Sequence, residues 1–133
     1  MPNAMKKGWD NRHFGRLFYE QIGPERWVLT QPFTYTGSNG FHVEVPVGFE
    51  TDLASVPRIA WTLYSKTGDL ARPSIPHDWL YVNAQVRDEA TRRSIDDIFM
   101  VAMNDAGIAK LGRNIVYRAV RDFGATVFYR KRQ

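Results

Sequence analysis

The spacing of apolar residues differs between the two halves of the chain. In the segment FHVEVPVGFET, apolar and polar residues alternate: Phe41, Val43 and Val45 against His42 and Glu44. A period of two predicts a strand with one face in water. The upstream segment RWVLTQPFTY is also rich in β-forming residues, and Asn39-Gly40 between the two is a strong turn signal. The first half therefore predicts an antiparallel hairpin.

The second half has helical spacing. From Asp88 to about Ala106, apolar residues recur every three or four positions: Ile95, Ile98, Phe99, Ala102 and Met103. Gly107 follows as the expected end of this helix. A shorter helix should begin in SIPHDWLYVNA, with Ser74 as N-cap and Pro76 in the first turn. We expect a further helix over residues 113–123, stopped by Gly124, and then a last strand in ATVFYR.

These patterns predict an α+β fold in one domain, with an N-terminal antiparallel hairpin or small sheet packed on two to three C-terminal helices. A length of 133 residues and a hydrophobic fraction of 44% suit a single core. The expected parts are an N-terminal arm (1–25), a β-rich part with a loop (26–60), a helical part (70–124), and a final strand with a basic tail (125–133).

Composition and missing motifs exclude several classes of protein. The chain has no cysteine, which excludes disulfides and thiolate metal sites. The net charge of +4 is modest and lies partly in the terminal YRKRQ, which is more typical of a solvated end than of a nucleic-acid site. We find no nucleic-acid-binding motif, no apolar run of membrane-spanning length and no signal-peptide core. We therefore expect synthesis and retention in the cytoplasm, unless the chain is packaged.

Two neighbouring acids in the long helix should have different surroundings. Asp96 projects at the edge of the apolar stripe, whereas Asp97 projects away from it into solvent. A buried carboxylate needs a partner. Arg92, one turn earlier, is one candidate for Asp96. The other is a group on a second helix.

The short helix carries the adjacent pair His77-Asp78. His77 shares the apolar face with Leu80 and Tyr81, and Asp78 points about 100° away, so the two cannot readily bond to each other. We expect His77 to reach Asp96, and Asp78 to face the loop that contains Asp52. A lone histidine on an apolar face is more often a satisfied core residue than a catalytic one, and Asp52 is more often a turn former than a ligand.

The chemical alternative uses the same residues. A histidine held by a carboxylate on one ring nitrogen can take a proton from water on the other. Asp52 and Asp78, with a loop carbonyl, could hold Ca²⁺. Zinc lacks support because the three histidines include no HxxxH pair, and no GxSxG, P-loop or GxGxxG motif occurs. The sequence leaves open whether an arginine pairs with these acids, the candidates being Arg58, Arg72 and Arg87.

Several blocks, in order, resemble the domain-of-unknown-function family numbered thirteen fifty-three, which is common in tailed phages and prophages. The blocks cover about the last two thirds of the chain: FETDLASVPR from Phe49, HDWLY from His77, IDDIF from Ile95 and AVRDFG from Ala119. In that pattern the helix acid precedes the phenylalanine by three, which again selects Asp96. The resemblance implies a phage or prophage origin and no particular activity.

A fainter similarity is to bacterial and fungal secretory phospholipases of the A type, on TDLAS, HDWLY and DDIF. It implies a catalytic set of His77 as general base, Asp96 as the group that orients it, and Tyr81. It also implies Ca²⁺ as a cofactor, bound by Asp52, Asp78 and the Leu53 carbonyl. The sequence departs from that pattern because Leu53 replaces a glycine, and Ala54 and Leu80 replace the cysteines that cross-link the helices.

Two functions follow as hypotheses. The first is a hydrolase of ester or amide bonds of the host envelope that uses the His-Asp site. The second is a non-catalytic head or tail component of a virion; a regulator that binds a host protein is a weaker third. The expected partners are other phage structural proteins or host envelope components. The expected location is the host cytoplasm after synthesis, with possible incorporation into the virion.

Overall fold

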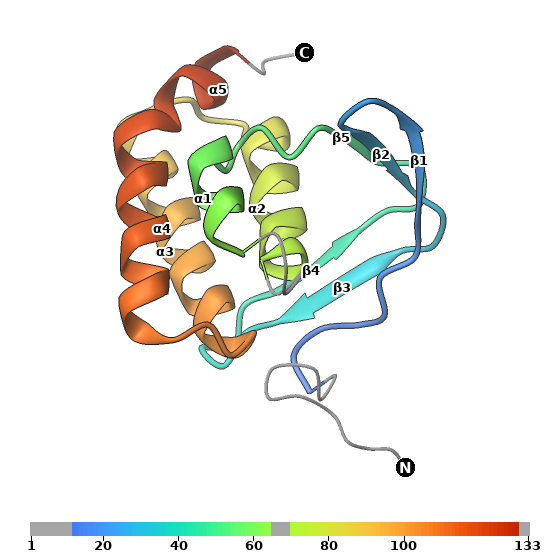
Figure 1. The fold of residues 1–133 in the computed structure, drawn as a ribbon, viewed down its shortest axis with the longest axis horizontal. Coiled ribbons are helices and arrows are strands. Elements are labelled where there is room, and N and C mark those ends of the chain that lie inside the picture. The colour runs from blue at the N-terminus through green and yellow to red at the C-terminus, as the bar shows by residue number, and fades with distance from the viewer. Residues whose placement is uncertain (1–11, 65–69, 131–133) are drawn as a thin grey trace.

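The computed structural model describes residues 12–64 and 70–130 and has an α+β architecture. Figure 1 shows the helices gathered on one side of the molecule and the strands on the other. The strands are β1 (Tyr19–Gly23), β2 (Arg26–Leu29), β3 (Phe33–Thr36), β4 (His42–Val45) and β5 (Glu50–Thr51). The helices are α1 (Arg58–Tyr64), α2 (Ala71–Asn83), α3 (Glu89–Asp105), α4 (Lys110–Phe123) and α5 (Ala125–Arg130). The described residues thus hold five helices rather than the expected two to three.

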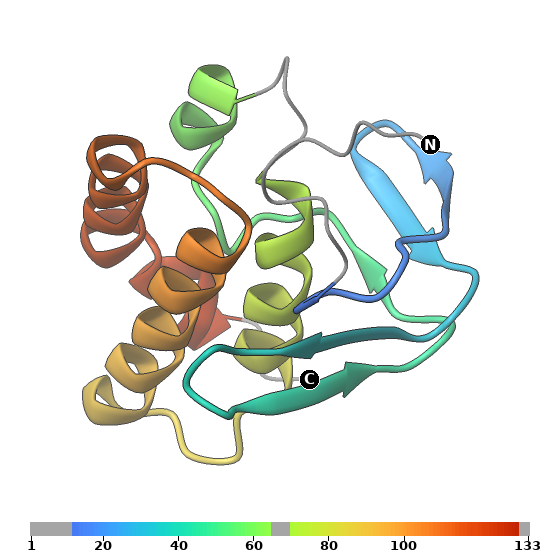
Figure 2. The same ribbon diagram turned by 90° about the horizontal axis from the view of Figure 1, so that it is seen from below.

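The predicted hairpin is formed by β3 and β4, which pair antiparallel from Phe33↔Val45 to Thr36↔His42. Gly40 in its turn has φ +91°, a conformation that glycine adopts without steric cost. Buried side chains of the hairpin, among them Phe33 and Tyr35, pack in one cluster with Ile75 of α2. Figure 2 shows the hairpin running alongside α2.

A second sheet, with strand order β1-β2-β5, was not predicted. The segment RWVLTQPFTY does not form one strand, because it is divided between β2 in this sheet and β3 in the hairpin. Pro32 lies between them and has no N–H for a sheet ladder. Strand β1 occupies part of the expected N-terminal arm; the rest of the arm up to residue 11, like the tail at 131–133, lies outside the described residues.

Helix α3 has the predicted extent and ends. The Asp88 carboxylate accepts a hydrogen bond from the Thr91 N–H at 2.8 Å, as an N-cap does. At the other end Gly107 has φ +86° and the Ile108 N–H bonds to the Met103 carbonyl at 3.0 Å, which closes the last turn. Asp96 is buried in the helix and Asp97 is exposed, as predicted.

Helix α2 begins earlier than predicted. Its first residue is Ala71, so Ser74 lies inside the helix and its hydroxyl donates to the Leu70 carbonyl at 2.6 Å instead of capping the N-terminus. Pro76 accordingly lies beyond the first turn, where it removes an intrahelical hydrogen bond. The early start keeps His77 and Asp78 well within the helix, where adjacent side chains diverge.

The expected final strand in ATVFYR is wrong, since these residues form α5. In a strand, Val127 and Phe128 would point to opposite faces. Both are buried in the helix, where adjacent side chains diverge by about 100° instead of pointing to opposite faces. Phe128 packs edge-on against Tyr81, with ring centroids 5.0 Å apart. Arg87 donates to the Phe128 carbonyl at 2.8 Å and so ties α5 to the end of α2.

No helix in residues 12–64 or 70–130 combines the length and apolar character that crossing a membrane requires.

Candidate functional site

His77 and Asp96 meet between α2 and α3. His77 Nε2 lies 2.8 Å from Asp96 Oδ1, the contact that the sequence predicted. The connection at residues 84–88 returns the chain so that the two helices pack side by side. The imidazole is 1% exposed and lies between the rings of Tyr81 and Phe99, with centroid distances of 4.2 and 4.5 Å. The pair is therefore part of the core.

Asp96 accepts hydrogen bonds from three further side chains. The Tyr81 hydroxyl donates to Oδ1 at 2.6 Å, and Arg121 Nη1 donates to Oδ2 at 2.7 Å. Arg92 Nη1, the predicted intrahelical partner, lies 3.4 Å from Oδ2. Burial alone would raise the pKa of Asp96, but hydrogen bonds from His77, Tyr81 and Arg121 outweigh it and hold the pKa below its ordinary value.

The ionisation of Asp96 fixes the arrangement of protons around His77. An ionised carboxylate only accepts, so Nε2 carries the proton that it donates to Asp96. In the neutral imidazole Nδ1 is then an acceptor. Ser55 Oγ is fully buried and lies 3.0 Å from Nδ1, and its hydroxyl donates to Nδ1 when the imidazole is neutral. Both ring nitrogens of His77 are thus engaged with protein groups.

Arg92 and Arg121 form a charged clasp together with Asp96 and Glu89. Glu89 accepts from Arg92 at 2.7 Å and from Arg121 at 2.8 Å. These hydrogen bonds lower the pKa of Glu89 to about 2. The positive charges of Arg92 and Arg121 therefore balance the negative charges of Asp96 and Glu89 across α3 and α4. Arg92 also donates to the Val120 carbonyl at 3.3 Å.

Sequence reasoning missed the roles of two residues. Arg121 lies in the AVRDFG block and Ser55 in TDLASVPR. The sequence predicts no role for either side chain. Of the three arginines considered as partners, Arg58 bonds to Glu25 and Arg87 bonds to main-chain carbonyls. The Arg72 guanidinium lies over the Phe14 ring at 5.1 Å.

Asp78 faces the end of β5, next to the loop that contains Asp52, and its contact there is with Thr51, the last residue of the strand. The Thr51 hydroxyl donates to Asp78 Oδ2 and accepts from the Leu53 N–H at 2.8 Å. Asp52 is exposed, and its Oδ1 accepts from the Ala54 N–H at 2.9 Å, which is an Asx turn. Leu53 adopts φ +57°, a left-handed conformation uncommon outside glycine.

The calcium site stays a prediction. Within the described parts of the chain, no three side chains of His, Cys, Asp or Glu gather closely enough to hold a metal ion. Asp78 is buried against Thr51, whereas Asp52 is exposed and bonded to its own loop. The two carboxylates of the predicted site therefore have different surroundings, one buried and one exposed.

Comparison with known proteins places the chain in a family. A model described as protein of unknown function (DUF1353) matches residues 27–120, which is more than half of the chain. The chain belongs to the DUF1353 family. Comparisons with curated proteins and with solved structures gave no significant match. The DUF1353 match spans β2 to α4 and includes Ser55, His77 and Asp96, and it stops one residue before Arg121.

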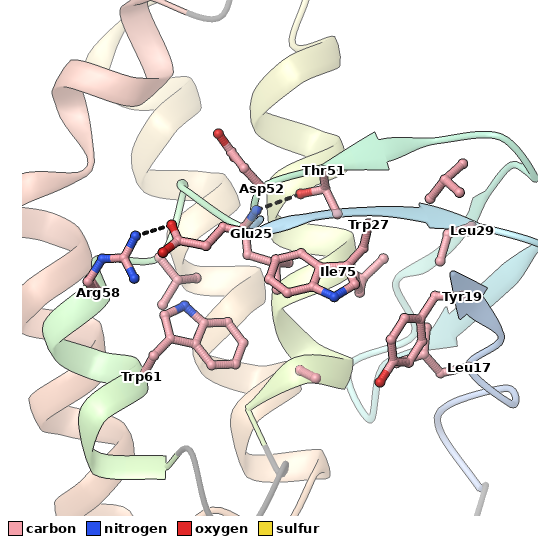
Figure 3. Close-up of a pocket in the computed structure, with 14 residues that line it drawn as sticks. Leu17, Tyr19, Glu25, Trp27, Leu29, Thr51, Asp52, Arg58, Trp61 and Ile75 are labelled. Atoms are coloured by element: carbon pink, nitrogen blue, oxygen red, sulfur yellow. Dashed lines mark hydrogen bonds and ion pairs between the residues drawn. The ribbon is translucent and has the colours of Figure 1, made fainter. Parts of the chain in front are cut away.

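The DUF1353 domain also has an open hollow of about 450 Å³, separate from the His77 network. It is lined by β1, β2, the segment from Thr51 to Val56, α1 and the start of α2. Figure 3 shows Trp27 and Ile75 at its centre, Trp61 toward one end and Tyr19 toward the other. Ser55, His77 and Asp96 are not among its lining residues. In the loop after β5, Asp52, Leu53 and Val56 thus line the hollow. Ser55 of the same loop belongs to the buried network instead.

Proposed function

We propose that the chain is a non-catalytic binding domain that takes part in a protein assembly, with the hollow as its binding site. The observation that carries this proposal is the state of His77: its side chain is buried and both ring nitrogens are bonded to protein groups. A general base needs hydrogen-bond reach to substrate or water. The open surface lies instead at the hollow, which His77 does not line.

In this proposal the side chains of His77 and Asp78 hold the end of β5 and the following loop in place. His77 holds Ser55, and Asp78 holds Thr51, so two successive residues of α2 fix the end of β5 and the loop that follows it. Thr51, Leu53 and Val56 of this segment line the hollow. Asp96, with its arginine clasp, fixes His77 in turn. The buried network thereby determines the shape of the hollow wall.

The hollow has the composition of a protein-binding site. Aromatic side chains are enriched in binding hot spots, and anchors that fill concave pockets carry much of the binding energy. Three aromatic residues, Tyr19, Trp27 and Trp61, line this hollow. The phage or prophage origin that the family resemblance implies makes head or tail proteins the expected partners.

The experiment compares two variants in particles of a phage that encodes this chain. Trp61→Ala removes a hollow side chain, and Phe123→Ala removes an exposed aromatic on α4 that does not line the hollow. Quantitative mass spectrometry of purified particles should find the wild type and the Phe123 variant at equal levels and the Trp61 variant depleted. Wild-type particles without this chain would contradict a virion role, and equal incorporation of both variants would contradict the role of the hollow.

A hydrolase is the second candidate, and one observation favours it. The contacts from Ser55 Oγ to His77 Nδ1 at 3.0 Å and from His77 Nε2 to Asp96 at 2.8 Å link a hydroxyl, an imidazole and a carboxylate, the order used by serine nucleophiles. Substrate would reach Ser55 only if the loop at residues 52–57 moved. An esterase assay with p-nitrophenyl butyrate tests this candidate: activity that Ser55→Ala abolishes, with folding retained, would favour it over the binding domain.

A further inference from the structure

We propose that the hollow binds a segment of a partner protein that inserts an apolar side chain between Trp27 and Trp61 and places a lysine or arginine beside Glu25 and Asp52. This inference rests on the proposed binding function and adds the chemistry of the partner. The hollow has an apolar interior and a charged end, and each part restricts the occupant separately.

The interior selects an apolar side chain. Leu29, Val56 and Ile75 form buried parts of the lining, and Trp27 and Trp61 are half-buried, so their rings face the hollow without being covered. Covering this surface removes apolar area from water at about 25 cal/mol per Å². The volume of about 450 Å³ is in the range of sites that hold one or two large side chains.

The charged end selects a cation. Among the residues that the structure describes, the charged side chains that line the hollow are those of Glu25, Asp52 and Arg58, two acids and one base. Arg58 pairs with Glu25 and lowers its pKa, while the charge of Asp52 acts in the opposite direction, so the two carboxylates sense each other. A lysine or arginine near them would relieve this repulsion, and its charge can also lie over an indole face. This local acidity contrasts with the +4 charge of the whole chain.

The surroundings favour a protein segment over a free small molecule. A pocket for a small ligand encloses most of the ligand surface. Here the hollow opens beside β1, an edge strand of its sheet, where Phe18, Tyr19 and Ile22 are 45%, 56% and 41% exposed. These side chains extend the apolar surface beyond the hollow. A peptide chain can cover both surfaces at once.

Two synthetic peptides test the proposal: acetyl-Gly-Lys-Leu-Phe-Lys-Gly-amide, and the same peptide with glutamates in place of the lysines. Neither contains tryptophan, so the fluorescence of Trp27 and Trp61 reports binding. We expect the lysine peptide to bind at least about tenfold more tightly than the glutamate peptide. The double variant Glu25→Gln, Asp52→Asn should remove this preference, and Trp61→Ala should weaken both peptides, whereas Phe123→Ala should change neither.

Three results would overturn the inference: no binding of either peptide, equal affinity for both, or binding of phenethylamine as tight as that of the lysine peptide. The last result would indicate a small amphiphilic ligand. The particle experiment separates this failure from failure of the proposed function. If Trp61→Ala still depletes the chain from particles while the peptides do not discriminate, the binding function stands and only the partner chemistry is wrong.

Discussion

Asp96 Oδ2 lies 2.7 Å from Arg121 Nη1, and this contact joins a buried carboxylate on α3 to the end of α4. The same carboxylate holds His77 on α2 through its other oxygen. One acid therefore connects three helices, and its partners remain buried or half-buried with it. The following predictions test what this connection does.

Replacing Asp96 with asparagine should destabilise the fold strongly. The change leaves Arg92 and Arg121 facing a neutral group in the interior, and removing one partner of a buried ion pair costs about 3–5 kcal/mol. Urea denaturation gives the free energy of unfolding. Asp97→Asn is the matched control, because the neighbouring acid is exposed and accepts a hydrogen bond from the Tyr117 hydroxyl; we expect a loss of less than about 1 kcal/mol. Equal losses would show that Asp96 has no special role.

Replacing Thr51 with valine should loosen the wall of the hollow. The hydroxyl is buried, donates to Asp78 and accepts from the Leu53 N–H, so its loss leaves buried groups poorly satisfied at a cost of about 1–3 kcal/mol. Hydrogen exchange should quicken at residues 52–56. Thr62→Val, at an exposed position on α1, is the control and should leave this exchange unchanged. Unaltered exchange in the Thr51 variant would argue against a role of the Thr51–Asp78 contact in holding this segment in place.

Acid should weaken the clasp. The pKa of Asp96 is lowered, and that of Glu89 is lowered to about 2, relative to the unfolded chain. Groups with a depressed folded pKa stabilise the protein above their unfolded pKa of about 4, and this contribution is lost as the pH falls through the folded value. The melting temperature should therefore drop between about pH 4 and pH 2. Glu89→Gln should make that drop shallower, and an unchanged slope would contradict the assignment.

We expect calcium to leave the stability of the protein unchanged, since Asp78 already binds the Thr51 hydroxyl and Asp52 binds a main-chain N–H of its own loop. A ligand that binds only the native state raises the melting temperature. Thermal denaturation at millimolar Ca²⁺ should thus match that in EDTA. A rise that Asp52→Asn abolishes would restore the calcium site.

Helical projection predicted the centre of the site correctly. It separated Asp96 from Asp97, and it placed His77 on the apolar face, so two apolar faces joined by a short connection had to bring His77 and Asp96 together. Arg121 could not be assigned in this way, because its position depends on how the end of α4 packs. Ser55 lies in an irregular loop without periodicity, and its contact with His77 depends on tertiary structure.

The same limit explains the errors in the fold. Strand β5 has only two residues, and β1 is exposed along most of its length, so neither carries the alternation that reveals a strand. ATVFYR is rich in β-forming residues, but it forms a helix in which Val127 and Phe128 are both buried. In β1, β5 and ATVFYR, tertiary packing determines the secondary structure more than local propensity does.

Solvent does not reach His77 in the folded protein, and chemical modification of the histidines can measure this. Diethylpyrocarbonate modifies accessible imidazoles, and mass spectrometry can locate the modification among the three histidines of the chain. We expect rapid modification of the exposed His42 and none of His77 in the native protein, with both modified after denaturation. Modification of native His77 at a rate close to that of His42 would show that solvent reaches the imidazole and would favour the hydrolase.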